Sequence, residues 1–278
     1  MLRGKTILIT GGAGSVGTQL TKKLLEYPVK AIRVLDIDEH ALFRLGRLAQ
    51  NSKLRLLLGS ITDKDRVELA GNGVDYIIHL AAIKNIEISE YNPIETIDAN
   101  INGIVNLIKM SMRHKPAKFL NISTDKAVEP STLYGTTKLL GERLVSWAGM
   151  HIPITKFATV RFGNIFETRG NVLEIWNYEA GNKKALSITD PAMKRYFFHI
   201  DEAVDFILQC LPMADHGDIF VPKMKLYKMK EIASKLSQKH KIVGVRRGEK
   251  MEEKLLTSQE MKNAVEAKNF WIIKNQLA

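Results

Sequence analysis

Cysteine is the scarcest residue in this sequence, with Cys210 alone among 278 residues. One thiol cannot close an intramolecular disulfide, so the fold does not depend on disulfides, and the apolar helical pattern around Cys210 predicts a buried core residue. No stretch reaches the roughly 20 apolar residues that a membrane-spanning helix needs, and we expect no stable membrane insertion. Residues 1–10 lead directly into a strand-like run, and we expect no cleavable leader. These absences together predict a cytoplasmic protein.

Concentrated positive charge is also lacking, although the chain is basic overall. Lysine and arginine number 41 against 30 aspartates and glutamates, a formal net charge of +11. The basic residues are spread along the chain, without a long block and without zinc-finger spacing, so we expect no nucleic-acid partner. A phosphate-bearing substrate would use part of this positive field. The seven histidines show no metal-ligand spacing, and we expect no metal.

Short apolar runs do recur through the first 160 residues, with amphipathic stretches between them. Runs rich in β-branched residues and leucine predict strands that are buried on both faces, as in a parallel sheet covered by helices. We therefore predict an α/β fold, a Rossmann-type doubly wound parallel sheet with a small C-terminal substrate lobe. The predicted strands are 6–10, 31–35, 54–58, 76–80, 119–122 and 158–162, and the clearest helices are 15–26, 93–113 and 134–147.

The regular alternation weakens after residue 165. Residues 165–192 carry glycine, asparagine, threonine and proline, as loops around a site do, whereas helical patterns return at 201–211, 228–237 and 258–266. We predict a dinucleotide-binding domain over residues 1–165 and a substrate-binding lobe over residues 166–278. Part of that lobe, about 197–222, is expected to pack back on the first domain. Ligands of such sheets bind at the carboxyl ends of the strands.

A glycine loop joins the first predicted strand to the first helix. Gly11 permits the tight turn, Gly14 lets the backbone approach a pyrophosphate, and Gly17 allows close helix packing. The helix that begins near Ser15 and Val16 offers free N–H groups to a phosphate. A strand before the glycines and a helix after them is the context that a dinucleotide site requires.

Asp36 ends the second predicted strand, about 20 residues beyond the glycines. A carboxylate there accepts hydrogen bonds from the hydroxyls of the adenosine ribose, and it would repel the 2′-phosphate of NADP. The sequence therefore favours NAD. Arg44 and Arg47 could soften that discrimination, so NADP stays possible.

Tyr134 and Lys138 form a Tyr-x-x-x-Lys pair at the start of a predicted helix. Residues four apart share a helix face, so the ammonium can lower the phenol pKa and also reach the cofactor ribose. A phenolate near neutrality can remove a proton from a sugar hydroxyl while hydride leaves its carbon. Thr124 ends the preceding strand and joins the predicted catalytic group.

These residues together resemble the extended short-chain dehydrogenase/reductase family. A narrower resemblance lies in Ser-Thr-Asp-Lys-Ala-Val at 123–128, followed by Tyr134-Gly-x-x-Lys138. It looks like the UDP-N-acetylglucosamine 4,6-dehydratases of the polysaccharide-biosynthesis branch. The resemblance runs from about residue 5 to about residue 257. Further matching stretches are Ala81-Ala82-Ile83-Lys84, Arg161-Phe162-Gly163-Asn164, Arg169-Gly170 and Ile188-Thr189-Asp190-Pro191-x-Met193-x-Arg195.

The resemblance implies a tightly bound cofactor that is oxidised and restored in each turnover. Asp125 and Lys126 would supply the acid and base that eliminate water across C5 and C6 of a UDP-N-acetylhexosamine. Arg195 and Arg246 are the candidates for the UDP pyrophosphate, because a guanidinium fork matches phosphate oxygens. The remaining expected cofactor contacts are Ser60, Ile61, Ala81, Ala82, Lys84 and Asn100, and the remaining expected substrate contacts are Lys84, Asn164, Arg169 and Glu249.

The sequence departs from this branch at several positions. Ser60 stands where an aspartate is typical, so an adenine contact differs, and Glu167 lies where a small residue is common. Most departures fall in the substrate lobe, which leaves the sugar as the weakest inference.

Two other functions stay open. A UDP-sugar 4-epimerase would need Tyr134 and Lys138 but no elimination acid or base. A non-catalytic dinucleotide-binding or nucleic-acid-binding protein would need neither pair. The helices predicted at 93–113 and 134–147 commonly pair between subunits in this superfamily, so we expect a homodimer or a higher homo-oligomer.

Overall fold

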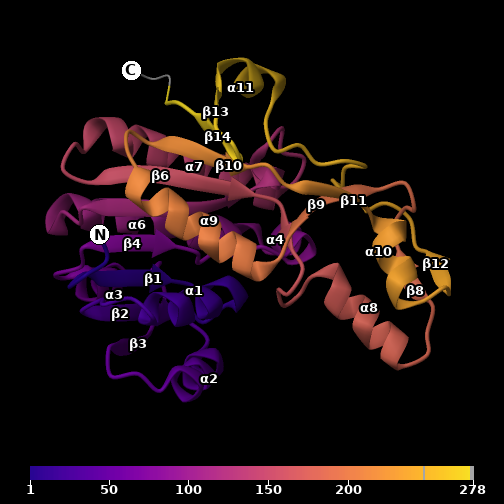
Figure 1. The fold of residues 1–278 in the computed structure, drawn as a ribbon, viewed down its shortest axis with the longest axis horizontal. Coiled ribbons are helices and arrows are strands. Elements are labelled where there is room, and N and C mark those ends of the chain that lie inside the picture. Colours follow the sequence, from indigo (N-terminus) through magenta and orange to yellow (C-terminus); the bar gives the residue numbers. More distant parts are fainter. Residues whose placement is uncertain (247, 276–278) are drawn as a thin grey trace.

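A nine-stranded sheet forms the centre of the computed structural model, which describes residues 1–246 and 248–275 (Figure 1). The strand order is β13-β14-β10-β6-β5-β4-β1-β2-β3. Seven strands run parallel, and β14 and β13 are antiparallel to their neighbours. The order 3-2-1-4-5-6 within it is that of a doubly wound sheet, which confirms the predicted fold class. The strands are β1 Thr6–Thr10, β2 Ala31–Asp36, β3 Leu54–Leu58, β4 Tyr76–His79, β5 Lys118–Thr124, β6 Lys156–Phe162, β10 Asp218–Pro222, β13 Val265–Glu266 and β14 Phe270–Ile273.

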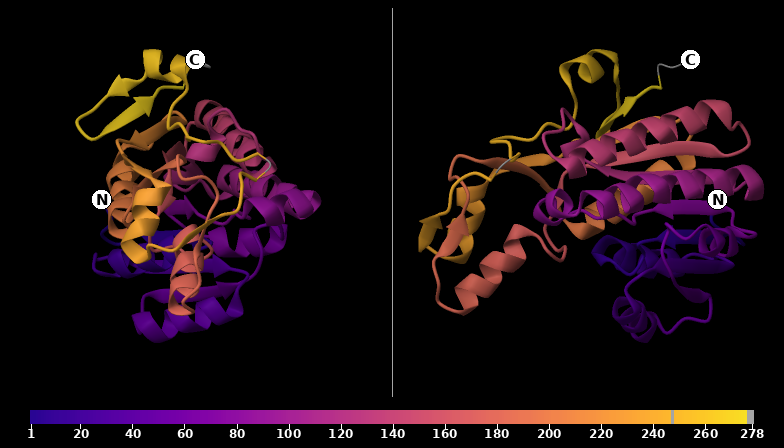
Figure 2. Two further views of the ribbon diagram at one scale, coloured as in Figure 1. Left: turned by 90° about the vertical axis from the view of Figure 1, so that its right-hand side faces the viewer. Right: turned by 180° about the vertical axis from the view of Figure 1, so that it is seen from behind.

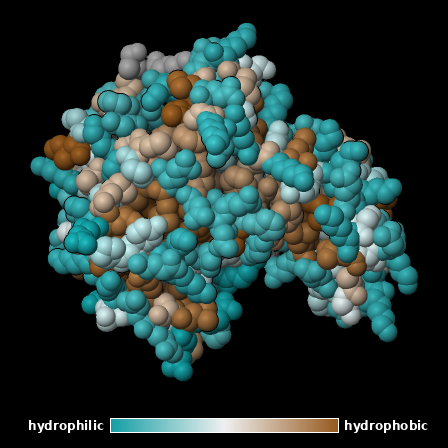
Figure 3. All heavy atoms as spheres, viewed as in Figure 1, coloured by the Kyte–Doolittle hydropathy of each residue, from teal (hydrophilic) through white to brown (hydrophobic). Residues whose placement is uncertain are grey.

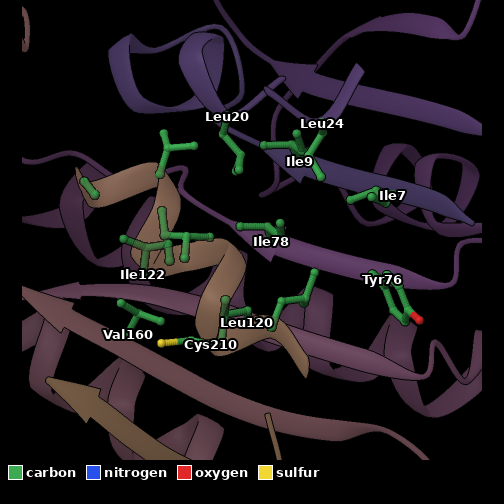
Figure 4. Close-up of a cluster of buried hydrophobic side chains, with 14 of the residues drawn as sticks. Ile7, Ile9, Leu20, Leu24, Tyr76, Ile78, Leu120, Ile122, Val160 and Cys210 are labelled. Atoms are coloured by element: carbon green, nitrogen blue, oxygen red, sulfur yellow. The ribbon is translucent and has the colours of Figure 1, made fainter. Parts of the chain in front are cut away.

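Helices cover both faces of the sheet, and alternate strand residues point to each. On one face α1 (Ser15–Leu25), α2 (Glu39–Ala49) and α9 (Ile200–Met213) pack on side chains such as Ile7, Ile9 and Ile78 (Figures 1 and 4). On the other, α3 (Lys64–Gly71), α6 (Gly103–His114) and α7 (Leu133–His151) pack on Leu8 and Ile77, and Figure 2 shows this face from behind. Cys210 of α9 is fully buried in the first cluster, as predicted.

The six strands predicted in the first 160 residues all form, with ends that differ by a few residues at most. One expectation about them is wrong. β3 is not buried on both faces, because it is the outermost strand of the sheet, and Leu56 and Leu58 are exposed. The helices α2 and α3, and the short α4 (Ile86–Tyr91), were not among the clear predictions.

The predicted helix 93–113 is three consecutive pieces. α5 (Pro93–Ile97) runs into a π-helical turn at Asp98–Asn102, which continues as α6. Such turns often occur at functional sites. Here the widened turn lets Asn100 reach across to the loop after β4: its side chain accepts from the N–H of Ile83 at 2.8 Å and donates to the carbonyl of Ile83 at 3.0 Å.

The lobe projects beyond the carboxyl ends of the parallel strands, with a notch between it and the main body on the face shown in Figure 3. Its own core centres on Trp176, Ile188 and Phe197. The elements of the lobe are β7 Asn164–Ile165, α8 Val172–Gly181, β8 Leu186–Ile188, β9 Lys194–Phe198, β11 Lys225–Lys228, α10 Met229–Leu236 and β12 His240–Ile242.

The chain returns to the main sheet twice. Between β9 and β11 of the lobe, α9 packs on the sheet and β10 joins it. After the lobe, the terminal pair β13–β14 joins the sheet beyond α11 (Ser258–Asn263). The helix predicted at 258–266 therefore ends early and is followed by a strand. The division into domains at residue 165 stays a prediction.

A buried ion network fastens this returning segment to the sheet. Arg161 of β6 is 1% exposed, and its guanidinium donates to both carboxylate oxygens of Glu142 (3.0 and 2.6 Å) and of Glu260 (3.0 and 2.9 Å). It also donates to the carbonyl of Leu255 at 3.1 Å. Burial by itself would raise the pKa of Glu260, but its hydrogen bonds with Arg161 and the charge of that guanidinium hold the pKa below its usual range.

We expect Glu260→Gln to lower the free energy of unfolding by about 1–3 kcal/mol, since it removes the negative charge and one of the two oxygens that accept from the buried guanidinium. The urea midpoint measures the effect. The control is Glu231→Gln, because Glu231 pairs with Lys228 at 3.7 Å on the surface, where both side chains are more than half exposed. That change should cost less than about 0.5 kcal/mol. Equal losses in the two variants would contradict the role given to the network.

Candidate active site

A large cavity of about 1490 Å³ lies between the carboxyl ends of the strands and the lobe. All of the site residues predicted from the sequence line it, except Asn100 and Asp125. Asn100 lies behind the wall, where it holds the loop at Ile83 and donates to Thr137 at 3.0 Å. The described part of the chain holds no cluster of histidine, cysteine, aspartate and glutamate that could bind a metal ion.

The glycine loop approaches its neighbours too closely for side chains. Gly11 has φ +67°, and a Cβ there would lie 2.6 Å from Cα of Ala81. A Cβ on Gly17 would lie 2.4 Å from Cα of Gly12. The residues from Gly14 to Gly17 face the cavity at the first turn of α1. The backbone N–H groups of a first helical turn have no acceptor within the helix. The loop therefore has the form of an anion-binding turn.

Asp36 is fixed beside this loop at the end of β2. Its Oδ2 accepts from the N–H of Ala13 at 2.9 Å, and its Oδ1 accepts from the N–H of Asp38 at 3.1 Å. Ser60 and Ile61, after β3, line the cavity near Asp36, and so do Ala81 and Ala82 after β4. This end of the cavity has the polarity and shape that an adenosine ribose needs.

Lys84 and Arg169 meet across the cavity wall. The ammonium of Lys84 donates to the backbone carbonyl of Arg169 at 2.8 Å. Burial lowers the pKa of Lys84, and the neighbouring charge of Arg169 lowers it further. Arg169, expected on the substrate, also contacts the glycine loop, where its guanidinium donates to the carbonyl of Ala13 at 3.1 Å.

The Tyr134–Lys138 pair lies in the first turns of α7. Thr132 caps this helix by accepting from the N–H of Gly135 at 3.1 Å, and a Cβ on Gly135 would lie 2.3 Å from the carbonyl oxygen of Lys126. The close approach presses α7 onto the turn after β5. Tyr134 and Lys138 are 9% and 8% exposed, and the ammonium of Lys138 donates to the carbonyl of Ile122 at 2.5 Å.

The pKa values of this pair differ from the expectation. Burial raises the pKa of Tyr134, the charge of Asp125 raises it further, and a hydrogen bond with Thr124 opposes them. Burial lowers the pKa of Lys138 to about 8, against an opposing effect of Glu142 one turn along the helix. In the protein by itself the phenol pKa therefore lies above its ordinary value, because burial and the charge of Asp125 outweigh the hydrogen bond with Thr124.

Asp125 and Lys126 form the short helical turn that follows β5. Asp125 is completely buried, and its Oδ1 accepts from the ammonium of Lys126 and from the hydroxyl of Thr124, both at 3.0 Å. Its Oδ2 has no hydrogen-bond partner among the described residues. Lys126 and Thr124 face the cavity, whereas Asp125 lies behind them. The carboxyl group is thus placed to exchange protons with its two neighbours.

The substrate end of the cavity is formed by the lobe. Arg195 is 8% exposed and donates to the carbonyls of Lys194 (2.8 Å) and Met251 (3.3 Å). Arg246 is exposed, and its Nε lies 3.1 Å from a carboxylate oxygen of Glu87. Asn164 accepts weakly from the ammonium of Lys126 at 3.5 Å. Glu249 accepts from the N–H of Arg246 at 3.2 Å.

Several other residues of the cavity wall were not singled out from the sequence. Glu87, which pairs with Arg246, had no signal beyond its place near the Ala-Ala-Ile-Lys stretch. Trp176 and Ser187 come from a segment without clear periodicity. Glu142 acts on Lys138 from behind the wall, and its spacing of four residues on the same helix was the signal that could have found it.

The chain was compared with known protein families. The family described as "Polysaccharide biosynthesis protein" matches residues 7–275. The chain belongs to that family. It lies in the polysaccharide-biosynthesis branch of the extended short-chain dehydrogenases/reductases, as the sequence motifs predicted.

Three relatives are similar to this chain over 98% of its length. An uncharacterized membrane protein of Methanocaldococcus jannaschii is 39% identical, and the match covers 86% of its length. A UDP-N-acetylglucosamine 4,6-dehydratase (inverting) of Campylobacter jejuni is 36% identical, and a UDP-glucose 4-epimerase of Rickettsia bellii is 34% identical, each matched over 84% of its length. In the described part of this chain no helix has both the length and the apolar character to cross a membrane.

Solved structures show the same fold. Pen from Bacillus thuringiensis superposes with a TM-score of 0.96 at 31% identity, over 100% of this chain and 91% of that chain. DesIV, a dTDP-glucose 4,6-dehydratase from Streptomyces venezuelae, superposes with a TM-score of 0.84 at 19% identity, over 92% and 90%. The second likeness bears on the fold alone.

We expect Lys138→Met to stabilise the dinucleotide-free protein at pH 7 by about 1–3 kcal/mol. The folded-state pKa is about 8 and the ordinary value is 10.5, so below pH 8 the native state has to bury an ammonium. That cost fades as the pH rises from 8 toward 10.5, and the advantage of the variant should shrink with it. Urea unfolding at pH 7 and pH 9.5 measures both effects. Lys241→Met, at an exposed position, is the control; a constant advantage at both pH values would contradict the assignment.

Proposed function

We propose that the protein is an NAD-dependent UDP-N-acetylhexosamine 4,6-dehydratase that releases a 4-keto-6-deoxy sugar nucleotide. The observation that carries the proposal is the Asp125–Lys126 pair, with the lysine facing the cavity beside Tyr134 and the carboxyl group buried behind it. Oxidation at C4 alone has no use for a second acid and base. The name of the Campylobacter jejuni relative supports this reading.

The cavity fits a nicotinamide dinucleotide. The turn from Gly11 to Gly17 would hold its pyrophosphate, Asp36 its adenosine ribose, and Lys138 its second ribose. The cofactor, tightly bound, would accept hydride from C4 of the sugar, return it to C6, and add positive charge near Tyr134 in its oxidised form.

Tyr134 would take the proton from the C4 hydroxyl. In the protein alone its pKa is raised by burial, and positive charge beside it works in the opposite direction. Lys138 is one turn further along α7, where its pKa of about 8 leaves it able to gain or lose a proton near neutrality. The two residues hold and move a proton at the C4 oxygen.

The Asp125–Lys126 contact supplies the elimination acid and base together. Moving one proton across the 3.0 Å between Nζ and Oδ1 turns the ion pair into a neutral amine and a carboxylic acid. In a desolvated place the neutral pair is less costly than it is in water. The amine then takes the C5 proton, the carboxylic acid passes its proton through the Thr124 hydroxyl to the C6 oxygen, and water leaves. The ion pair is restored. When hydride adds to C6, C5 would take a proton from the Lys126 ammonium, and the proton that Tyr134 removed from the C4 hydroxyl balances this transfer.

Arg195, Arg246, Asn164 and Glu249 would orient the nucleotide sugar at the lobe end of the cavity. The two guanidinium groups supply the positive charge that a UDP pyrophosphate needs. Arg246 would exchange its pairing with Glu87 for the phosphate.

A UDP-sugar 4-epimerase is the second candidate, and the name of the Rickettsia bellii relative favours it. It would use Tyr134 and Lys138 at C4 in the same way and return hydride to C4 on the opposite face. The Asp125–Lys126 pair would then be structural.

Assembly and location extend the proposal. We infer a homodimer or higher homo-oligomer through α5, α6 and α7, because Ile94 of α5, Met112 of α6 and Leu140 of α7 are exposed. We also infer that the protein acts in the cytoplasm, where nucleotide sugars are made, and that residues 1–165 and 166–278 divide cofactor from substrate binding.

Incubation with UDP-N-acetylglucosamine should yield a product lighter by one water, with no net reduction of NAD. Mass spectrometry of the product measures this. A product of unchanged mass with an inverted C4 hydroxyl would establish the epimerase in its place.

Lys126→Ala should block dehydration by about 10²–10⁴-fold, because it removes the base, yet still allow substrate to reduce bound NAD. Nicotinamide absorbance in a single turnover separates the two steps. Lys254→Ala, which breaks a surface pair with Glu129, is the control and should behave as wild type. Dehydration at the normal rate in Lys126→Ala would refute the assigned base.

Asp36→Ala should shift the ratio of NAD to NADP affinity toward NADP by about tenfold or more, because it removes both a ribose acceptor and a like charge. Equilibrium binding of the two dinucleotides measures the ratio. Asp65→Ala, at an exposed position of α3, is the control. An unchanged ratio would mean that Asp36 does not select the cofactor.

A further inference from the structure

The segment between β7 and α8, residues 166–171, lies across the glycine loop. We refer to these residues as the strap. The backbone N–H of Arg169 donates to Oγ of Ser15 at 3.0 Å, at the first residue of α1. The guanidinium of Arg169 donates to the carbonyl of Ala13 at 3.1 Å and lies 3.9 Å from a carboxylate oxygen of Asp38. The strap therefore touches the chain at the positions where the pyrophosphate and the adenosine ribose would bind.

The contacts of the strap bring positive charge to the glycine loop. The glycine loop has no lysine or arginine between Gly11 and Gly17, and Asp36 and Asp38 beside it are both acidic. A dinucleotide pyrophosphate carries two negative charges, so cations from elsewhere in the chain would strengthen the binding that the N–H groups of the glycine loop offer. Arg169 supplies one guanidinium, and Lys84, which donates to the carbonyl of Arg169, supplies an ammonium.

The strap is internally tied, so that Arg169 is held in place. The side chain of Asn171 donates to the carbonyls of Ile165 (3.0 Å) and Phe166 (2.7 Å), and the hydroxyl of Thr168 donates to the carbonyl of Ile165 at 3.1 Å. Gly170 has φ +72°, which provides the turn that this loop needs.

Glu167 anchors the strap on the side away from the cavity. One carboxylate oxygen accepts from the N–H of Ile200 at 2.9 Å, at the first turn of α9, and the other lies 2.6 Å from Nδ1 of His199. A carboxylate at a helix N-terminus is stabilised by the free N–H groups and the helix dipole. The helix α9 packs against α1, the helix of the glycine loop, so both ends of the contact share one rigid layer.

We propose that Arg169 binds the dinucleotide and not the nucleotide sugar, and that the strap, positioned by Glu167, retains the cofactor through the catalytic cycle. The proposal rests on the proposed cofactor, and it gives Arg169 a different ligand from the substrate expected from the sequence. A redox-neutral reaction needs such retention, because a cofactor lost after the first hydride transfer would leave the sugar oxidised and the enzyme without its hydride.

Equilibrium binding of NAD and of UDP, each alone, to wild type, Arg169→Ala and Arg246→Ala tests the ligand of Arg169. Arg169→Ala should weaken NAD by about tenfold or more and leave UDP within about twofold, as loss of a charge-assisted contact predicts. Arg246→Ala, the matched arginine at the lobe end, should do the reverse. Weakened UDP binding with unchanged NAD binding in Arg169→Ala overturns the proposal.

The dissociation rate of NAD in stopped flow tests the strap. Glu167→Ala should speed dissociation by about fivefold, while Glu167→Gln, whose amide oxygen can still accept from the N–H of Ile200, should retain most of the wild-type rate. A Glu167→Ala protein that melts earlier but releases NAD at the wild-type rate shows a merely structural role and overturns the strap. These measurements use no sugar, so they stand even if the product is not dehydrated; a wild type that binds no dinucleotide refutes both proposals.

Discussion

Parallel pairing of the central strands is the constraint on which the rest of this structure depends. The register matches Thr10 with His79, His79 with Asn121, and Thr124 with Phe162, so β1, β4, β5 and β6 finish at one edge. The loop that follows each of these strands therefore lies at that edge of the sheet. The glycine loop, the Ala-Ala-Ile-Lys stretch and the Asp125–Lys126 turn are far apart in the chain, and they share one cavity for this reason.

Desolvation governs the chemistry of that edge. The carboxyl ends of the strands are covered by α7 and the lobe, so Lys138, Tyr134 and Asp125 all lie in places that water reaches poorly. Burial raises the pKa of Tyr134 and lowers the pKa of Lys138, so both groups are shifted toward their neutral forms. His79 next to them has a pKa lowered to about 3, by burial and then by Lys138, and stays neutral while it bonds the hydroxyl of Thr10 at 2.7 Å.

Local patterns in the sequence were sufficient for the strands, the glycine loop and the catalytic helix. Each depends on neighbours within a few residues: continuous apolar runs, glycines three apart, a tyrosine and lysine one helical turn apart. The exposure of β3 could not be read in this way, because the edge position follows from strand order and not from composition. The same limit hid the burial of Asp125 behind Lys126. An adjacent acid and lysine look like a solvated pair until the packing of α7 is known.

Contacts between segments that are far apart in the chain could not be predicted from the sequence. Arg169 carries no sequence signal for its contacts with Ser15 and Ala13, which depend on the path of residues 166–171 across the start of α1. The π-helical turn at Asp98–Asn102 could not be predicted from the sequence either, because the apolar pattern runs from α5 through this turn into α6 without a break.

The ion network at Arg161 also sets an order of events during synthesis. Glu142 is translated 19 residues before Arg161, but Glu260 follows 99 residues after it. Before Glu260 has been synthesised, the guanidinium has only the Glu142 carboxylate as a partner in this network, and β14 is also still to be made. The helix that carries Tyr134 and Lys138 shares this network through Glu142. That helix can therefore reach its final electrostatic surroundings only after Glu260 has been made, although its own residues are complete when the chain is little more than half synthesised.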